Sequence, residues 1–205
     1  MQPGLFYIFK FYEGTKRGMS MGARTIPIIQ IVGYKNAGKT TVVKLLIESL
    51  KEAGYKVGAM KHHGHGGKPN RIEGTDSNSY LEAGAAVSAV QGDGEWQFTL
   101  TDKIPFDLDT MIQMQLSLGI DIIVIEGFKH LNYPKIVLLR DERDEELLEL
   151  SNIHAVGGWR IPHDSEALFT FSIVDFARYK KELLELLIKA GEQYGENVLG
   201  NKRAD

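Results

Sequence analysis

The sequence predicts an α/β domain of three layers, in which helices cover both faces of a mostly parallel central sheet. Three observations lead to this fold class. Short apolar, β-branched runs alternate with segments of helical periodicity along most of the chain. A strand, a loop, a helix and a second strand follow one another between residues 26 and 60, the order of a right-handed βαβ unit. The 205 residues, 43% hydrophobic and 25% charged, have the composition of an ordinary globular protein.

The elements follow from local periodicity and from the glycines that end helices. In chain order we expect strands at 26–32, 55–60, 85–90, 96–100, 120–125, 135–139 and 153–156, and helices at 40–53, 76–83, 108–118 and 174–190. The Gln-Gly-Asp-Gly turn between the third and fourth strands predicts a small antiparallel hairpin beside the main sheet. Residues 141–149 hold six acids and one arginine, a pattern typical of a solvated helical face.

The chain is predicted to hold one domain. Met21 is followed by a short polar stretch and then by a well-formed strand, as a natural start would be. We therefore expect residues 1–20 to be an extension outside the fold and residues 21–195 to form the domain. The last segment, 196–205, is expected to be a frayed tail.

The composition excludes several classes of site. The chain has no cysteine, so disulfides, thiolate zinc sites and cysteine nucleophiles are ruled out. The formal net charge of −3 argues against broad nucleic-acid binding. No run of 18 apolar residues predicts a transmembrane helix, and the apolar residues 5–12 lack the basic flank of a secretory signal. We therefore expect a cytoplasmic protein with neither membrane nor nucleic-acid partners.

The strongest functional signal is a glycine-rich turn between the first strand and the first helix. Residues 33–40 match the phosphate-binding pattern G-x-x-x-x-G-K-[ST] in the strand–loop–helix context that it requires. Lys39 is expected to reach the β- and γ-phosphates and the Thr40 hydroxyl to bind Mg²⁺, so the fold class becomes a P-loop NTPase domain. The predicted nucleotide-binding residues of the loop are Gly33, Tyr34, Lys35, Asn36, Ala37, Gly38, Lys39, Thr40 and Thr41.

Acidic residues are predicted to complete the site. Glu126 ends an apolar strand at the carboxyl edge of the sheet, where ligands of parallel sheets gather. We predict that Glu126 acts with Lys39 in catalysis and with Thr40 in holding Mg²⁺. Asp121 begins the same strand, faces the opposite edge and is left out. Asp76 either binds Mg²⁺ through water or caps its helix.

The sequence Lys61-His62-His63-Gly64-His65 follows the second strand at the same predicted edge. Three interpretations stay open: anion or substrate binding by Lys61 and His63, a metal site, or a polar loop without function. No motif by itself separates GTP from ATP.

Four segments in this order are similar to one family: 33–41, 61–65, 74–77 with 82–85, and 125–129. Over about residues 25–190 the chain resembles the molybdopterin-guanine dinucleotide biosynthesis protein B (MobB) family. The resemblance implies a GTP-binding homodimer with Mg²⁺ and slow intrinsic GTPase activity. It also implies an adapter for the molybdenum cofactor guanylyltransferase, acting by supplying GTP or by contacting cofactor-loading proteins. The roles of Lys39, Thr40 and Glu126 carry over.

One departure limits what the resemblance implies. Lys35 stands third in the loop, whereas the deviant P-loop of related dimeric ATPases has its signature lysine second, so a lysine acting across a dimer is not expected. Two other functions remain as alternatives: a P-loop small-molecule kinase, and a metal-delivery GTPase that uses the histidines of residues 62–65.

Overall fold

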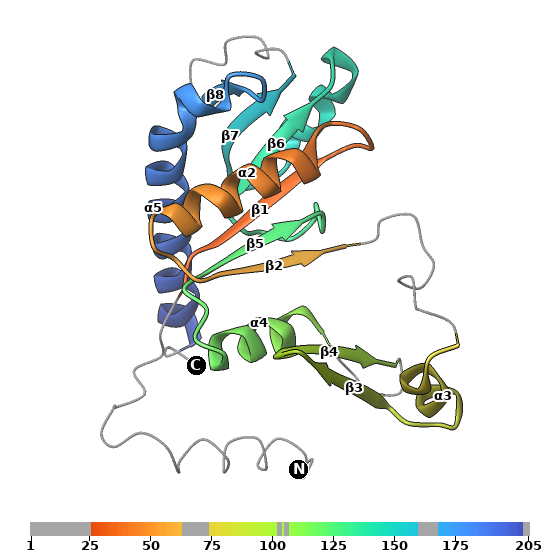
Figure 1. Cartoon of the computed structure of the whole chain (residues 1–205). Helices are drawn as coiled ribbons and strands as arrows, with labels where there is room; N and C mark the ends of the chain where they lie inside the picture. Colours follow the sequence, from red (N-terminus) through yellow and green to blue (C-terminus); the bar gives the residue numbers. More distant parts are fainter. Residues whose placement is uncertain (1–25, 63–73, 102–103, 105–106, 160–167, 203–205) are drawn as a thin grey trace.

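The computed structural model describes residues 26–62, 74–101, 104, 107–159 and 168–202. Its centre is a six-stranded sheet in the order β2-β5-β1-β6-β7-β8, and every neighbouring pair in it is parallel (Figure 1). The strands are β1 (Ile28–Gly33), β2 (Val57–Lys61), β5 (Ile122–Glu126), β6 (Lys135–Leu139), β7 (Ile153–Gly158) and β8 (Phe169–Ser172). The predicted parallel sheet is therefore confirmed.

Helices cover both faces of this sheet. On one face, α2 (Lys39–Glu52) and α5 (Phe176–Lys202) pack against alternate residues of the strands, among them Ile29 and Ile31 of β1. On the other face lie α4 (Leu108–Ser117) and the 3₁₀ helix η1 (Glu142–Glu149), which pack against the remaining residues of the strands. Both faces are buried, so the strands are continuously apolar rather than alternating. The three-layer prediction is confirmed.

A small unit lies apart from the main sheet (Figure 1). It consists of α3 (Asp76–Glu82) and the antiparallel hairpin of β3 (Val87–Gly92) and β4 (Glu95–Leu100). Asp93 and Gly94, both with positive φ, form the two-residue turn, which is the backbone that Asp-Gly favours in hairpins. The predicted hairpin embellishment is confirmed.

Three features of the fold differ from the predictions. Residues 169–172 form β8, where the sequence pattern predicted no strand. The acidic segment 141–149 is not wholly solvated, because Asp144 and Leu147 are buried and Leu147 packs against one face of the sheet. A count of charges does not show that one acid of the run, Asp144, is buried against an arginine. Helix α5 extends to Lys202, whereas the sequence pattern predicted a helix ending at residue 190. Residues 1–20 lie outside the described part of the chain.

Candidate functional site

The loop between β1 and α2 turns sharply at its two glycines. Gly33 ends β1 with a φ of +157°, and a Cβ atom there would lie 2.7 Å from the Leu138 carbonyl oxygen of β6. Gly38 precedes α2 with a φ of +92°, a left-handed conformation that glycine adopts without penalty. Between them the Ala37 N–H donates to the Tyr34 carbonyl at 3.2 Å. Only glycine fits at both ends of this loop, which we call the phosphate cradle after the sequence pattern that it matches.

The start of α2 faces this cradle. The Val42 N–H donates to the Gly38 carbonyl at 3.0 Å, which is the first hydrogen bond of the helix. The N–H groups of Lys39, Thr40 and Thr41 precede it and have no acceptor four residues back within the helix. Together with the helix dipole they attract an anion.

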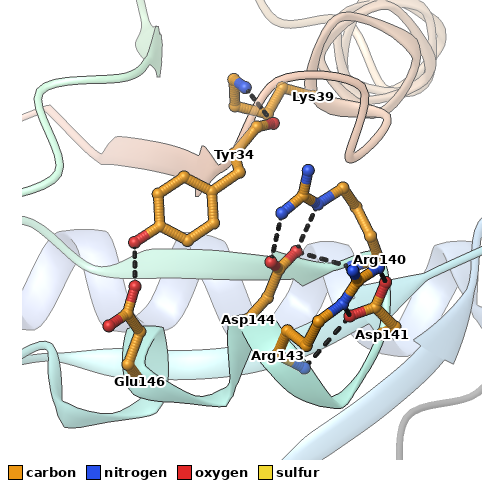
Figure 2. Close-up of polar contacts among 7 residues, drawn as sticks. All are labelled: Tyr34, Lys39, Arg140, Asp141, Arg143, Asp144 and Glu146. Carbon is orange, nitrogen blue, oxygen red and sulfur yellow. Dashed lines mark hydrogen bonds and ion pairs between the residues drawn. The ribbon is translucent and has the colours of Figure 1, made fainter.

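Lys39 reaches back across the loop. Its Nζ donates to the Tyr34 carbonyl at 2.7 Å, as Figure 2 shows. Burial lowers the pKa of Lys39, the Glu126 carboxylate opposes this effect, and the positive charges of Lys61 and Arg140 add to it. Among the described residues no carboxylate forms an ion pair with this ammonium group, which suits it to meet a phosphate.

Three side chains from three elements meet beside the loop. Glu126, at the end of β5, is 5% exposed, and its Oε2 accepts from the Thr40 hydroxyl at 3.1 Å. The Lys61 Nζ, at the end of β2, lies 2.9 Å from Glu126 Oε1 and also donates to Thr40 Oγ1 at 3.4 Å. The parallel pairing of β2, β5 and β1 brings them to one edge, with Lys61 opposite Glu126 and Glu126 opposite Ile31.

A glutamine fixes the chain after Glu126. Gln30 of β1 is fully buried, and its Nε2 donates to the carbonyls of Gly127 at 2.8 Å and of Phe128 at 2.6 Å. Both residues have positive φ, +93° and +53°, and at Phe128 this conformation is strained. The Phe128 ring packs on that of His62, with centroids 4.4 Å apart. Gln30 therefore orients the turn that follows the buried carboxylate.

Tyr34 and two ion pairs, Arg140–Asp144 and Arg143–Asp141, lie on the other side of the loop (Figure 2). The Tyr34 hydroxyl donates to Glu146 of η1, a contact that raises the pKa of Tyr34. The Arg140 guanidinium binds both carboxylate oxygens of Asp144, at 2.8 and 2.6 Å, and lies 5.4 Å from the Tyr34 ring centroid. The Arg140 partner holds the pKa of Asp144 below its usual range. This network ties η1 to the phosphate-binding loop.

Comparison with known proteins identifies the family of the chain. The sequence model of MobB, described as molybdopterin guanine dinucleotide synthesis protein B, matches residues 28–159, the part that contains the loop and Glu126. This chain belongs to the MobB family.

Individual MobB proteins agree with this assignment. A Bacillus subtilis (strain 168) protein named "Probable molybdopterin-guanine dinucleotide biosynthesis adapter protein" is 44% identical over 134 residues, covering 65% of this chain and 76% of that protein. The Escherichia coli (strain K12) molybdopterin-guanine dinucleotide biosynthesis adapter protein is 34% identical over 140 residues, covering 66% and 79%. The crystal structure of Bacillus subtilis MobB aligns with a TM-score of 0.69 at 37% identity, covering 79% of this chain and 98% of that chain.

The structure brings together most of the residues predicted for the MobB site. The loop residues 33–41, Glu126 and Lys61 lie at one edge of the sheet. Asp121 lies at the opposite edge, where its carboxylate accepts from the Lys56 N–H, as expected. Asp76 is the first residue of α3, which lies with the hairpin apart from the main sheet (Figure 1). His63 is outside the described residues.

Two contributors to the site were not predicted. Gln30 lies within an apolar strand, and a polar residue in such a run is the signal that could have indicated it. The Arg140–Asp144 pair has i,i+4 spacing, but it spans the end of a strand and a 3₁₀ helix, so helical spacing rules do not reveal it.

Two features are absent from the described residues. In these parts of the chain, no three or more His, Cys, Asp or Glu side chains form a group that could hold a metal ion by themselves. No described helix combines the length and apolar character needed to cross a membrane.

Proposed function

We propose that this MobB-family protein binds GTP with Mg²⁺, hydrolyses it slowly, and acts as an adapter in molybdopterin-guanine dinucleotide biosynthesis. The phosphate cradle with Thr40, Glu126 and Lys61 beside it is the observation that carries the nucleotide proposal. The adapter role is supported by family membership and by the names of the Bacillus subtilis and Escherichia coli relatives.

The residues at the cradle fit a magnesium ion. Thr40 and Glu126 offer hydroxyl and carboxylate oxygens, which are the hard donors that Mg²⁺ prefers, and the ion keeps several waters in such sites. When bound, Mg²⁺ would neutralise negative charge on the β- and γ-phosphates. The Lys61 ammonium already lies 2.9 Å from Glu126, so this position accepts a cation.

The chain's own residues bind and orient the nucleotide in this proposal. The N–H groups at the start of α2 hold phosphate oxygens, and Lys39 exchanges the Tyr34 carbonyl for phosphate. Slow hydrolysis is expected because an arginine and a glutamine near the loop, both among the described residues, already have hydrogen-bond partners. Arg140 is bound bidentately to Asp144, and the Gln30 amide is bound to backbone carbonyls. Neither is free to stabilise charge or to orient water, as arginine and glutamine do in fast GTPases.

The experiment is a titration of the purified protein with fluorescent GTP and ATP analogues, with and without Mg²⁺, while phosphate release is followed. We expect GTP to be preferred and turnover to be slower than about 10⁻² s⁻¹. Lys39→Ala should weaken binding by about 10- to 150-fold, since a charge-assisted hydrogen bond contributes about 1.5–3 kcal/mol. Lys44→Ala, on the exposed side of α2, is the matched control and should bind normally. ATP preference, or normal binding by Lys39→Ala, contradicts the proposal.

Glu126→Gln separates a role in the metal site from a structural one. The variant keeps the shape of the side chain and should still bind nucleotide, but with weaker Mg²⁺ dependence and slower turnover. Unchanged turnover and Mg²⁺ dependence would leave Glu126 with a structural role.

For the adapter role, calorimetry should detect binding to purified molybdenum cofactor guanylyltransferase in the presence of GTP.

We further propose that the protein is a homodimer that uses the β3–β4 hairpin. One face of the hairpin carries apolar side chains that remain exposed: Val87 at 42%, Trp96 at 62% and Phe98 at 50%. A two-stranded hairpin with one uncovered apolar face is only marginally stable, so a second copy covering this face would stabilise both. In sedimentation experiments Trp96→Ser/Phe98→Ser should be monomeric, whereas Leu118→Ser, at another exposed apolar position, should behave as the wild type.

A further inference from the structure

We propose that the indole of Trp159 is the platform on which the base of the bound nucleotide stacks. This inference rests on the proposed nucleotide-binding function and adds to it a residue that neither the loop motif nor the family match assigns.

The direction of the nucleotide follows from the position of the cation site. Glu126 ends β5 and Lys61 ends β2, and both strands lie on one side of β1. Since Mg²⁺ binds the β- and γ-phosphates, the terminal phosphate belongs on that side of the loop. The nucleoside, at the other end of the phosphate chain, extends toward the other side, where the sheet continues with β6, β7 and β8.

Trp159 stands at that end of the site. It directly follows Gly158, the last residue of β7, and the next strand ends beside it, since the Ile173 N–H donates to the Gly158 carbonyl at 2.8 Å. A Cβ atom on Gly38 would lie 3.4 Å from both Cε2 and Cζ2 of Trp159 and 2.6 Å from Cδ1 of Ile173. The indole edge therefore lies against the last glycine of the phosphate cradle.

The burial of Trp159 distinguishes it from a core residue. Ile173, in contact with the same glycine position, is 4% exposed, whereas Trp159 is 46% exposed. The apolar packing beneath the loop is thus supplied by Ile173, and the indole, which lies beside the cradle, stays nearly half exposed. A base stacked on that surface would remove it from water, and every base has a π-face, so the contact does not select guanine over adenine.

Three probes separate this contact from phosphate binding: GTP, ATP and inorganic tripolyphosphate, which carries the phosphates without a nucleoside. Trp159→Ala should weaken GTP and ATP by similar factors, about 5- to 150-fold for the loss of one stacked base, and leave tripolyphosphate affinity within twofold of wild type. Trp159→Phe should recover most of the loss. Trp96→Phe keeps an aromatic ring on the apolar face of the hairpin, so it is the control and should bind all three ligands normally.

The Trp96→Phe variant also provides a direct readout, because Trp159 is then the only tryptophan in the chain. GTP should quench its fluorescence, and tripolyphosphate at saturating concentration should not. Equal losses of GTP and tripolyphosphate in Trp159→Ala, or no loss of either, would overturn the inference while leaving the nucleotide site intact. If the wild type binds neither GTP nor tripolyphosphate, the proposed function itself fails and the inference falls with it.

Discussion

Replacing Gly33 by alanine tests whether the close approach of β1 and β6 shapes the phosphate cradle. The new Cβ would lie 2.7 Å from the Leu138 carbonyl oxygen, which is backbone of the neighbouring strand and cannot move without breaking the β1–β6 pairing. Overpacking of this kind costs about 1–3 kcal/mol. The φ of +157° adds about 1–3 kcal/mol of conformational strain for a residue with a side chain. We therefore expect Gly33→Ala to lose about 2–6 kcal/mol of unfolding free energy.

Gly54→Ala is the matched control for this variant. Gly54 follows α2 with a φ of +91°, and a Cβ atom there would meet nothing within 4 Å. Gly54→Ala should therefore lose only the free energy of backbone strain, about 1–2 kcal/mol. The difference between the two variants thus isolates the clash with β6.

Urea unfolding followed by circular dichroism gives the two free energies, and each kcal/mol corresponds to about 2–4 °C in melting temperature for a chain of this length. Gly33→Ala should be at least about 1 kcal/mol less stable than Gly54→Ala and should have lost tight nucleotide binding. Equal unfolding free energies of the two variants would refute the reasoning, because they would mean that β1 and β6 move apart without loss of stability.

Two further predictions concern buried charges. Asp144 is 1% exposed, and Asp144→Asn should lower the free energy of unfolding by about 2–4 kcal/mol. Asp141→Asn, at the exposed Asp141–Arg143 pair, should lower it by less than about 1 kcal/mol in the same urea assay. Because its pKa is lowered, Asp144 contributes stability above pH 4 that is lost as the pH falls. The unfolding free energy of Asp144→Asn should therefore depend less steeply on pH in the acid range than that of the wild type. Burial lowers the pKa of Lys135 to about 8, so between pH 8 and 10 the unfolded chain binds more protons and wild-type stability should rise. Relative to Lys135→Met the rise should not exceed about 1.4 kcal/mol per pH unit, and a fall would contradict the assignment.

The phosphate cradle could be predicted in detail because its chemistry is local. Gly33, Gly38, Lys39 and Thr40 lie within eight consecutive residues, and their spacing alone places them between a strand and a helix. The carboxyl-edge position of Glu126 also followed from the sequence, since the residue ending a parallel strand lies at that edge whatever the strand order.

The neighbours of these residues were not predictable in the same way. The βαβ pattern indicates that β1 and β2 are parallel, but not that β5 lies between them, and this order is what brings Glu126 to Thr40 and Lys61. Asp144 is one of six acids in its segment, and only the position of Arg140 shows which of them is buried. Asp76 fits the charge pattern of a metal ligand, yet the fold places its helix beside the hairpin.

Period, glycine placement and motif spacing are properties of neighbouring residues, so the fold class, most elements and the phosphate cradle follow from the sequence alone. Strand order, the burial of one acid among six and the contact of Trp159 with the cradle depend on residues far apart in the chain. Such contacts are chosen by how the whole core packs, because many pairings satisfy the same local pattern and only one fills the space between sheet and helices.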